Sequence, residues 1–220
     1  LKNIVSEGRT IIANIERVSS LYLTKTVYSV ILCVLFILLA REYPFIPIQL
    51  SWMSAMAIGV PSFLLTLEQN ESMDGGGFLR HVLRIALPQA LAMVVCLLTI
   101  QVLTPFWNDD PTMTYMFNLL VGGTVSFMVV IEVCRPMNWV RRTMTVILIG
   151  IFALGIILFP GLLGIYSIFR WECVFALPMI CMVLVVSRAF RQLVILAYQL
   201  KDWAAVKIRG LIERDRKSVV

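Results

Sequence analysis

The sequence has 220 residues, of which 60% are apolar and only 15% are charged, and its formal net charge is +6. Such a composition excludes a soluble globular domain and indicates an all-α, polytopic membrane protein. The basic residues follow membrane topology, as shown below, so the positive charge does not indicate a nucleic-acid partner.

One long helix is predicted at the start of the chain, from about residue 6 to residue 40. Apolar side chains recur there at helical spacing between charged ones, and no proline occurs before Pro44. At ~1.5 Å per residue this helix is about 50 Å long, whereas the hydrocarbon of a bilayer is ~30 Å thick. Residues 1–21 are therefore predicted to form a cytoplasmic stalk, whose apolar stripe a missing cytoplasmic domain would cover.

Six apolar runs are long enough to cross a bilayer. They cover residues 22–40, 45–67, 82–103, 113–133, 143–160 and 168–187. The last run is the least regular, because Arg170 and Glu172 interrupt its start. The sequence thus predicts a six-helix transmembrane bundle over residues 22–187, followed by a basic cytoplasmic tail over residues 188–220.

The loops between these runs differ sharply in charge. Arg41 and Arg170 are the two basic residues on one side of the predicted membrane, and the other 17 of the 19 Lys and Arg residues fall on the opposite side. Loops that stay in the cytoplasm collect Lys and Arg. We therefore expect a multi-pass protein of the cell membrane, surrounded by the lipid bilayer, with both termini in the cytoplasm.

Polar groups within the predicted spans are candidates for function, because a charge in hydrocarbon costs ~2.5–3.5 kcal/mol on insertion scales. The candidates are Lys25, Thr26, Ser29, Gln49, Ser51, Ser54, Ser62, Asn118 and Glu132. Pro61, close after Gly59, is predicted to break the second span and free backbone carbonyls. The single histidine and the scattered cysteines predict no metal site.

Simpler interpretations of the same residues stay open. Lys25 lies about one turn inside the span and can extend its amine to water. Glu132 can pair with Arg135 three residues later on the same helix. Pro61 can mark a packing kink, and the small residues at 121–124 favour close helix contact over chemistry.

Three segments carry a resemblance to a known family. "EGRTIIANIERVSSLYLTKTVYS" followed by "PFIPIQLSWMSAMAIGVPSFLLTLE" resembles the fifth and sixth membrane helices of cation-transporting P-type ATPases, and "VVIEVCRPMN" is similar to the eighth helix of the calcium pumps. The resemblance implies the fifth to tenth membrane helices of a pump for calcium or another divalent cation. The chain does not begin with Met, so we expect a piece of a longer protein.

The resemblance also implies partners and cofactors. The pump motifs "DKTGT", "TGES" and "GDGxND" are absent from this sequence, so we expect no catalytic or cofactor-binding residue in this chain. ATP and Mg²⁺ are expected for a full-length pump only. The implied partners are the transported cation and the missing amino-terminal membrane helices and cytoplasmic domains.

The family's ion ligands correspond to few oxygen-bearing side chains here, and Glu132 is the only carboxylate that remains. The resemblance therefore implies an ion pathway that draws on Glu132, Ser54, Thr26, Ser29 and Asn118. Lys25, in "YLTKTVYS", is similar to a lysine of the gastric proton pump. By that resemblance Lys25 is an internal counter-ion paired with Glu132.

A second class of function is compatible with the same spans. A free-standing six-span channel or membrane scaffold would need no ATP-hydrolysing domains. The two hypotheses differ in the reading frame upstream of Leu1, where a pump would encode "GDGxND" and "DKTGT".

Overall fold

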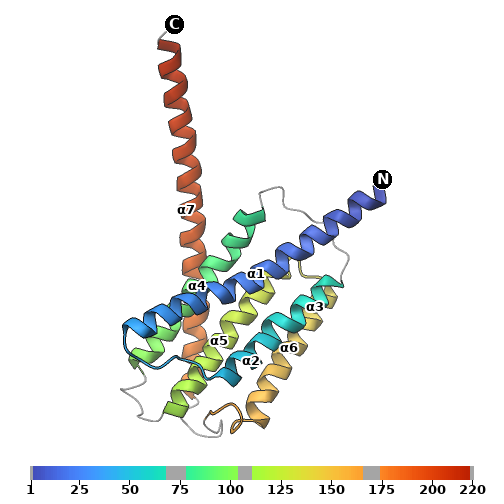
Figure 1. Ribbon diagram of the computed structural model, residues 1–220, viewed down its shortest axis with the longest axis vertical. Helices are drawn as coiled ribbons and strands as arrows, with labels where there is room; N and C mark the ends of the chain where they lie inside the picture. Colours follow the sequence, from blue (N-terminus) through green and yellow to red (C-terminus); the bar gives the residue numbers. More distant parts are fainter. Residues whose placement is uncertain (1, 68–77, 104–110, 166–173, 219–220) are drawn as a thin grey trace.

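The computed structural model describes residues 2–67, 78–103, 111–165 and 174–218. Its helices are α1 (Lys2–Leu38), α2 (Pro47–Ser54), the π-helical turn η1 (Ala55–Gly59), α3 (Val60–Thr66), α4 (Phe78–Leu103), α5 (Pro111–Val133), α6 (Trp139–Leu158) and α7 (Ala176–Ser218). Both termini lie at the same end of the bundle (Figure 1), which we call the terminal end; the opposite end is the far end.

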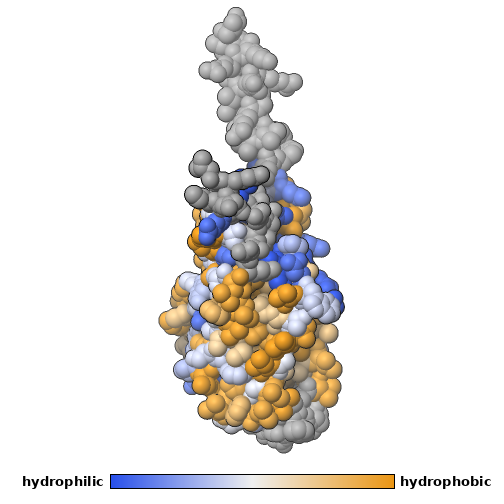
Figure 2. Space-filling view, turned by 90° about the vertical axis from the view of Figure 1, so that its right-hand side faces the viewer, coloured by the Kyte–Doolittle hydropathy of each residue, from blue (hydrophilic) through white to orange (hydrophobic). Residues whose placement is uncertain are grey.

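Six helical segments in the described part of the chain are long and apolar enough to cross a membrane, which confirms the predicted six-helix bundle. They are Glu7–Leu38, Pro47–Thr66, His81–Leu103, Pro111–Val133, Trp139–Leu158 and Ala176–Lys201. Apolar side chains cover much of the body of the molecule, and hydrophilic ones gather toward the terminal end (Figure 2). This distribution suits a bundle whose sides face lipid.

The predicted long first helix is confirmed, because α1 runs without interruption from Lys2 to Leu38. Its end has a defined backbone signal. Ala40 adopts a left-handed conformation with φ of 49°, and the N–H of Arg41 donates to the carbonyl of Phe36 at 3.0 Å. These are the marks of a Schellman motif, which satisfies carbonyls at the end of a helix.

The second span does not break at Pro61 as the sequence predicted. α2, η1 and α3 follow one another directly, so the helix continues through Pro61 and only its hydrogen-bond register changes. Proline alone does not dictate this change, because α4 contains Pro88 and stays α-helical.

The last helix also differs from the prediction. α7 begins at Ala176 rather than at residue 168, and it continues through the predicted tail to Ser218. Arg170 and Glu172 lie outside the described residues. No proline follows Pro178, so nothing in the backbone chemistry forces the helix to stop at the edge of the apolar run.

α5 lies in the middle of the bundle and carries the predicted small residues at 121–124. A Cβ added at Gly122 would lie 2.9 Å from the methyl group of Met53, and one added at Gly123 would lie 2.5 Å from the ring of Phe152. The structure thus confirms the expected close helix contact. The same holds on α6, where a Cβ at Gly155 would overlap the indole of Trp52.

Candidate functional site

A hydrogen bond joins the first and second spans inside the bundle. Lys25 Nζ on α1 donates to Ser54 Oγ at 2.6 Å, and Ser54 Oγ in turn donates to the carbonyl of Leu50 at 2.6 Å. Ser54 is the last residue of α2 and directly precedes η1. The ammonium of Lys25 is therefore held at the start of the π-helical turn.

The turn itself changes which carbonyls have donors. The N–H of Val60 bonds to the carbonyl of Ala55, five residues earlier, instead of that of Met56. Pro61 has no N–H to offer Ala57, its α-helical partner. The carbonyls of Met56 and Ala57 are thus left without an α-helical donor, and carbonyl oxygens are ligands that hard cations such as Ca²⁺ accept.

Glu132, near the end of α5, has two partners on other helices. Its Oε1 lies 3.1 Å from Arg191 on α7, and its Oε2 accepts a hydrogen bond from Gln89 Nε2 on α4 at 3.2 Å. The side chain of Glu132 is 15% exposed and that of Arg191 is 42% exposed. One carboxylate thus connects α4, α5 and α7.

The prediction that Lys25 and Glu132 form an ion pair is wrong for this structure. Lys25 turns to Ser54 on the second span, whereas Glu132 turns to Arg191 and Gln89. The alternative pair with Arg135 is not formed either in the described part of the chain. The reason is that Arg191 on α7 places its guanidinium next to Glu132, and the position of α7 could not be predicted from the sequence.

The other candidate residues lie apart from one another. Thr26 is exposed and donates to the carbonyl of Tyr22 on its own helix at 3.0 Å. Asn118 is fully buried and donates to the carbonyl of Pro44 at 2.7 Å, where the chain leads from α1 to α2. Burial raises the pKa of the Tyr43 hydroxyl, and a hydrogen bond with Ser29 opposes that rise. Among the candidates, the structure brings together Lys25 and Ser54.

Comparison with known proteins identifies relatives but no matching family model. The chain is 34% identical over 167 residues to the probable cation-transporting ATPase exp7 of Streptococcus pneumoniae, a match covering 71% of this chain and 21% of that protein. The calcium-transporting ATPase CtpE of Mycolicibacterium smegmatis is 34% identical over 158 residues, covering 64% of this chain and 20% of that protein. CtpE of Mycobacterium bovis is 42% identical over 105 residues, covering 43% and 13%.

The chain is homologous to part of the cation-transporting P-type ATPases. It spans about a fifth of the length of the first two relatives. In this homologue of the cation pumps, no group of three or more His, Cys, Asp or Glu residues comes together within the described ranges.

Three polar residues make contacts inside this bundle that the sequence did not predict, and two of them, Gln89 and Arg191, are not among the sequence candidates. Gln49 is fully buried and donates to the carbonyl of Leu163 at 2.9 Å, whereas Gln89 and Arg191 hold Glu132. The sequence marks Gln49 as an intramembrane polar group but predicts no contact for it. Gln89 carries the same signal, an amide within an apolar run, whereas Arg191 follows the predicted span and belongs to the predicted tail.

Proposed function

We propose that this chain forms the membrane transport region of an ATP-driven cation pump, with a divalent, calcium-like ion as its substrate. The observation that carries the proposal is the turn η1 beside Lys25, because it leaves two carbonyl oxygens without α-helical donors within a membrane span. The names of the relatives support the ion class, since two of them are called calcium-transporting ATPases.

In this proposal the carbonyls of Met56 and Ala57 contribute oxygens to one cation site. The missing amino-terminal membrane helices supply further ligands, and Glu132 is a carboxylate along the pathway. When no metal ion is bound, Lys25 supplies a positive charge beside the cation site. When a metal ion is bound, the charge of Lys25 repels that ion, which favours its release.

ATP hydrolysis belongs to domains outside this chain. The continuous α1 is suited to connect such a domain with the second span, because a 37-residue helix is about 55 Å long and α1 reaches Ser54 through Lys25. We propose that the terminal end faces the cytoplasm, in keeping with the charge distribution of the loops.

The decisive experiment is transport by the protein expressed from its complete gene and reconstituted into liposomes. Calcium uptake that requires ATP is the expected result, with Mg²⁺ and Mn²⁺ compared in parallel. Calcium flux that is equally fast without ATP would instead assign a channel. An absence of movement for every cation would remove the proposal altogether.

Cysteine labelling tests the proposed orientation separately. In a background without native cysteines, Met137→Cys reports the terminal end and Glu42→Cys reports the far end. We expect an impermeant maleimide to label residue 137 from the cytoplasmic side only and residue 42 from the outside only. The reverse pattern would invert the topology without changing the fold.

A further inference from the structure

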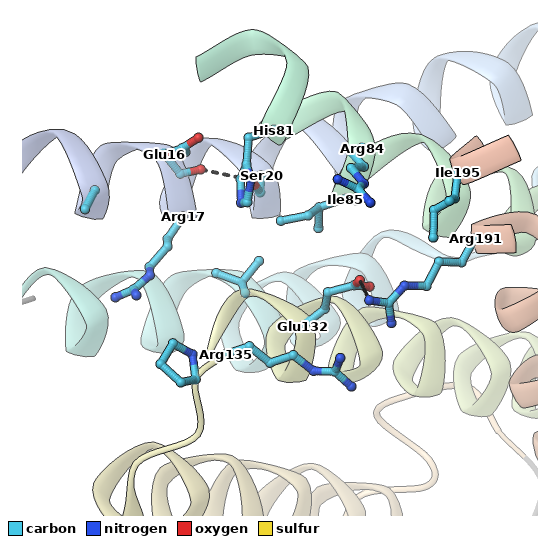
Figure 3. Close-up of a pocket in the computed structure, with 13 residues that line it drawn as sticks. Glu16, Arg17, Ser20, His81, Arg84, Ile85, Glu132, Arg135, Arg191 and Ile195 are labelled. Carbon is cyan, nitrogen blue, oxygen red and sulfur yellow. Dashed lines mark hydrogen bonds and ion pairs between the residues drawn. The ribbon is translucent and has the colours of Figure 1, made fainter. Parts of the chain in front are cut away.

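A pocket of about 320 Å³ lies toward the terminal end of the bundle, and Figure 3 shows the residues of its wall. Residues of α1, α4, α5 and α7 line it, together with the two residues that follow closely after α5. Its size falls within the range of sites that take small molecules, ~300–1,000 Å³. The charged side chains in its wall are four arginines and two glutamates: Arg17, Arg84, Arg135, Arg191, Glu16 and Glu132.

Arginines outnumber glutamates in the pocket wall, so the wall carries a net positive charge. Glu132 is already bound by Arg191 and Gln89. Arg84 and Arg135 are exposed, and within the described residues neither has an ion-pair partner. Two guanidinium groups from different elements are therefore available to an anion, and their planar donor geometry matches the oxygens of a phosphate group.

Glu16 adds a second requirement. Its residue is 9% exposed, and its Oε1 atom is buried without a hydrogen-bond donor in the described part of the protein. A buried carboxylate oxygen without a donor is unfavourable. An ionised phosphodiester has no O–H to donate, whereas a ligand that also carries a hydroxyl group would supply one.

Two of the helices that line the pocket, α1 and α7, also expose apolar side chains. Ile15, next to Glu16 on α1, is 51% exposed, and Leu196 and Leu200 on α7 are 51% and 64% exposed. Acyl chains can lie against such side chains while a headgroup enters the pocket. Basic pockets between membrane helices are known as sites for anionic lipid headgroups.

We propose that this pocket binds a phosphate ester that carries free hydroxyl groups, with the phosphate on Arg84 and Arg135 and a hydroxyl donating to Glu16 Oε1. Two sources share this chemistry: the glycerol or inositol headgroup of an anionic phospholipid, and a soluble glycerol phosphate. The exposed apolar side chains on α1 and α7 favour the lipid. The inference does not depend on transport, because it concerns binding alone.

The test uses the protein from its complete gene, stripped of lipid and inserted into phosphatidylcholine nanodiscs that contain some phosphatidylglycerol. Native mass spectrometry measures how much phosphatidylglycerol each protein retains. Arg84→Gln with Arg135→Gln should weaken retention by about fivefold for each arginine removed. The matched control is Arg142→Gln with Arg188→Gln, which removes the same charge outside the pocket wall and should retain as much lipid as the parent.

Two further arms examine the ligand. Phosphatidylmethanol has the same phosphodiester charge but no free hydroxyl, so the parent should prefer phosphatidylglycerol and Glu16→Ala should lose that preference. Calorimetry with glycerol phosphate in neutral nanodiscs reports the soluble source. Binding of glycerol phosphate without retention of phosphatidylglycerol would assign the soluble source. The proposal is overturned if the pocket pair and the control pair lose equal amounts of phosphatidylglycerol, or if neither ligand binds.

Discussion

Glu132 on α5 and Arg191 on α7 form an ion pair of 3.1 Å, with Gln89 of α4 bound to the second oxygen of the same carboxylate. Arg191 thereby fixes the last helix to the middle of the bundle. A charge within a membrane span would be costly without such partners. The three-helix contact explains how an acidic residue is accommodated at the end of a span.

The pair predicts a coupling between Glu132→Gln and Arg191→Met. Each single change leaves one charge without its partner, so the two destabilisations should exceed that of the double variant. Because Arg191 is partly exposed, we expect a coupling free energy of only about 1 kcal/mol. Thermal unfolding in detergent, followed by tryptophan fluorescence, measures it. Strictly additive effects would show that the pair contributes nothing.

Gly155 and Gly150 provide a matched test of close packing on α6. A Cβ at Gly155 would overlap the indole of Trp52 on the second span, whereas a Cβ at Gly150 would meet nothing within 4 Å. Gly155→Ala should therefore destabilise the protein by about 1–3 kcal/mol through overpacking. Gly150→Ala should be neutral or slightly stabilising, since alanine favours a helix.

Thermal unfolding midpoints of the Gly155→Ala and Gly150→Ala variants, measured in the same detergent, report this difference. Equal midpoints for the two variants would mean that α6 moves away from Trp52 at little cost. A drop for Gly150→Ala alone would contradict the packing shown by the structure.

Much of this fold could be predicted from the sequence because its signals are local. The span count, the long first helix and the close contacts of Gly122 and Gly123 follow from apolar run length, helical spacing and residue size. The contacts of the candidate site could not be predicted in the same way. The partner of a long side chain depends on which groups lie within its reach in the folded protein, so Lys25 bonds to Ser54 although charge alone favoured a carboxylate.

Pro61 shows a different limit of sequence reasoning. Proline removes an N–H wherever it occurs, and Pro88 does so in α4 without disturbing the α-helical register. The π-helical turn before Pro61 is therefore not encoded by the proline alone, and no other local pattern predicted it. The same is true of α7, where composition marks the apolar part but not the continuation of the helix to Ser218.

Lys25→Met tests the role of the internal cation, and this prediction rests on the proposed transport function. Without the ammonium, a cation at the carbonyls of η1 meets less repulsion, so its apparent affinity should rise and its release should slow. We expect a lower half-saturating concentration with reduced turnover in cation-stimulated ATP hydrolysis. Ser54→Ala keeps the charge and should leave affinity within about twofold. Identical behaviour of the two variants would point to the hydrogen bond instead of the charge.

Pro61→Ala tests whether η1 supplies the ion ligands. Alanine provides an N–H for the carbonyl of Ala57, so the turn can return to an α-helix and the free energy of unfolding should rise by about 1–3 kcal/mol. The same change withdraws carbonyl oxygens from the proposed cation site, so the affinity should fall by about tenfold or more, which corresponds to about 1.4 kcal/mol. Pro88→Ala also restores an N–H within a span but leaves η1 intact, and it should stabilise the protein with unchanged cation affinity. Cation-dependent ATP hydrolysis and thermal unfolding of both variants give the comparison, and an unaltered affinity in Pro61→Ala would place the ion ligands outside η1.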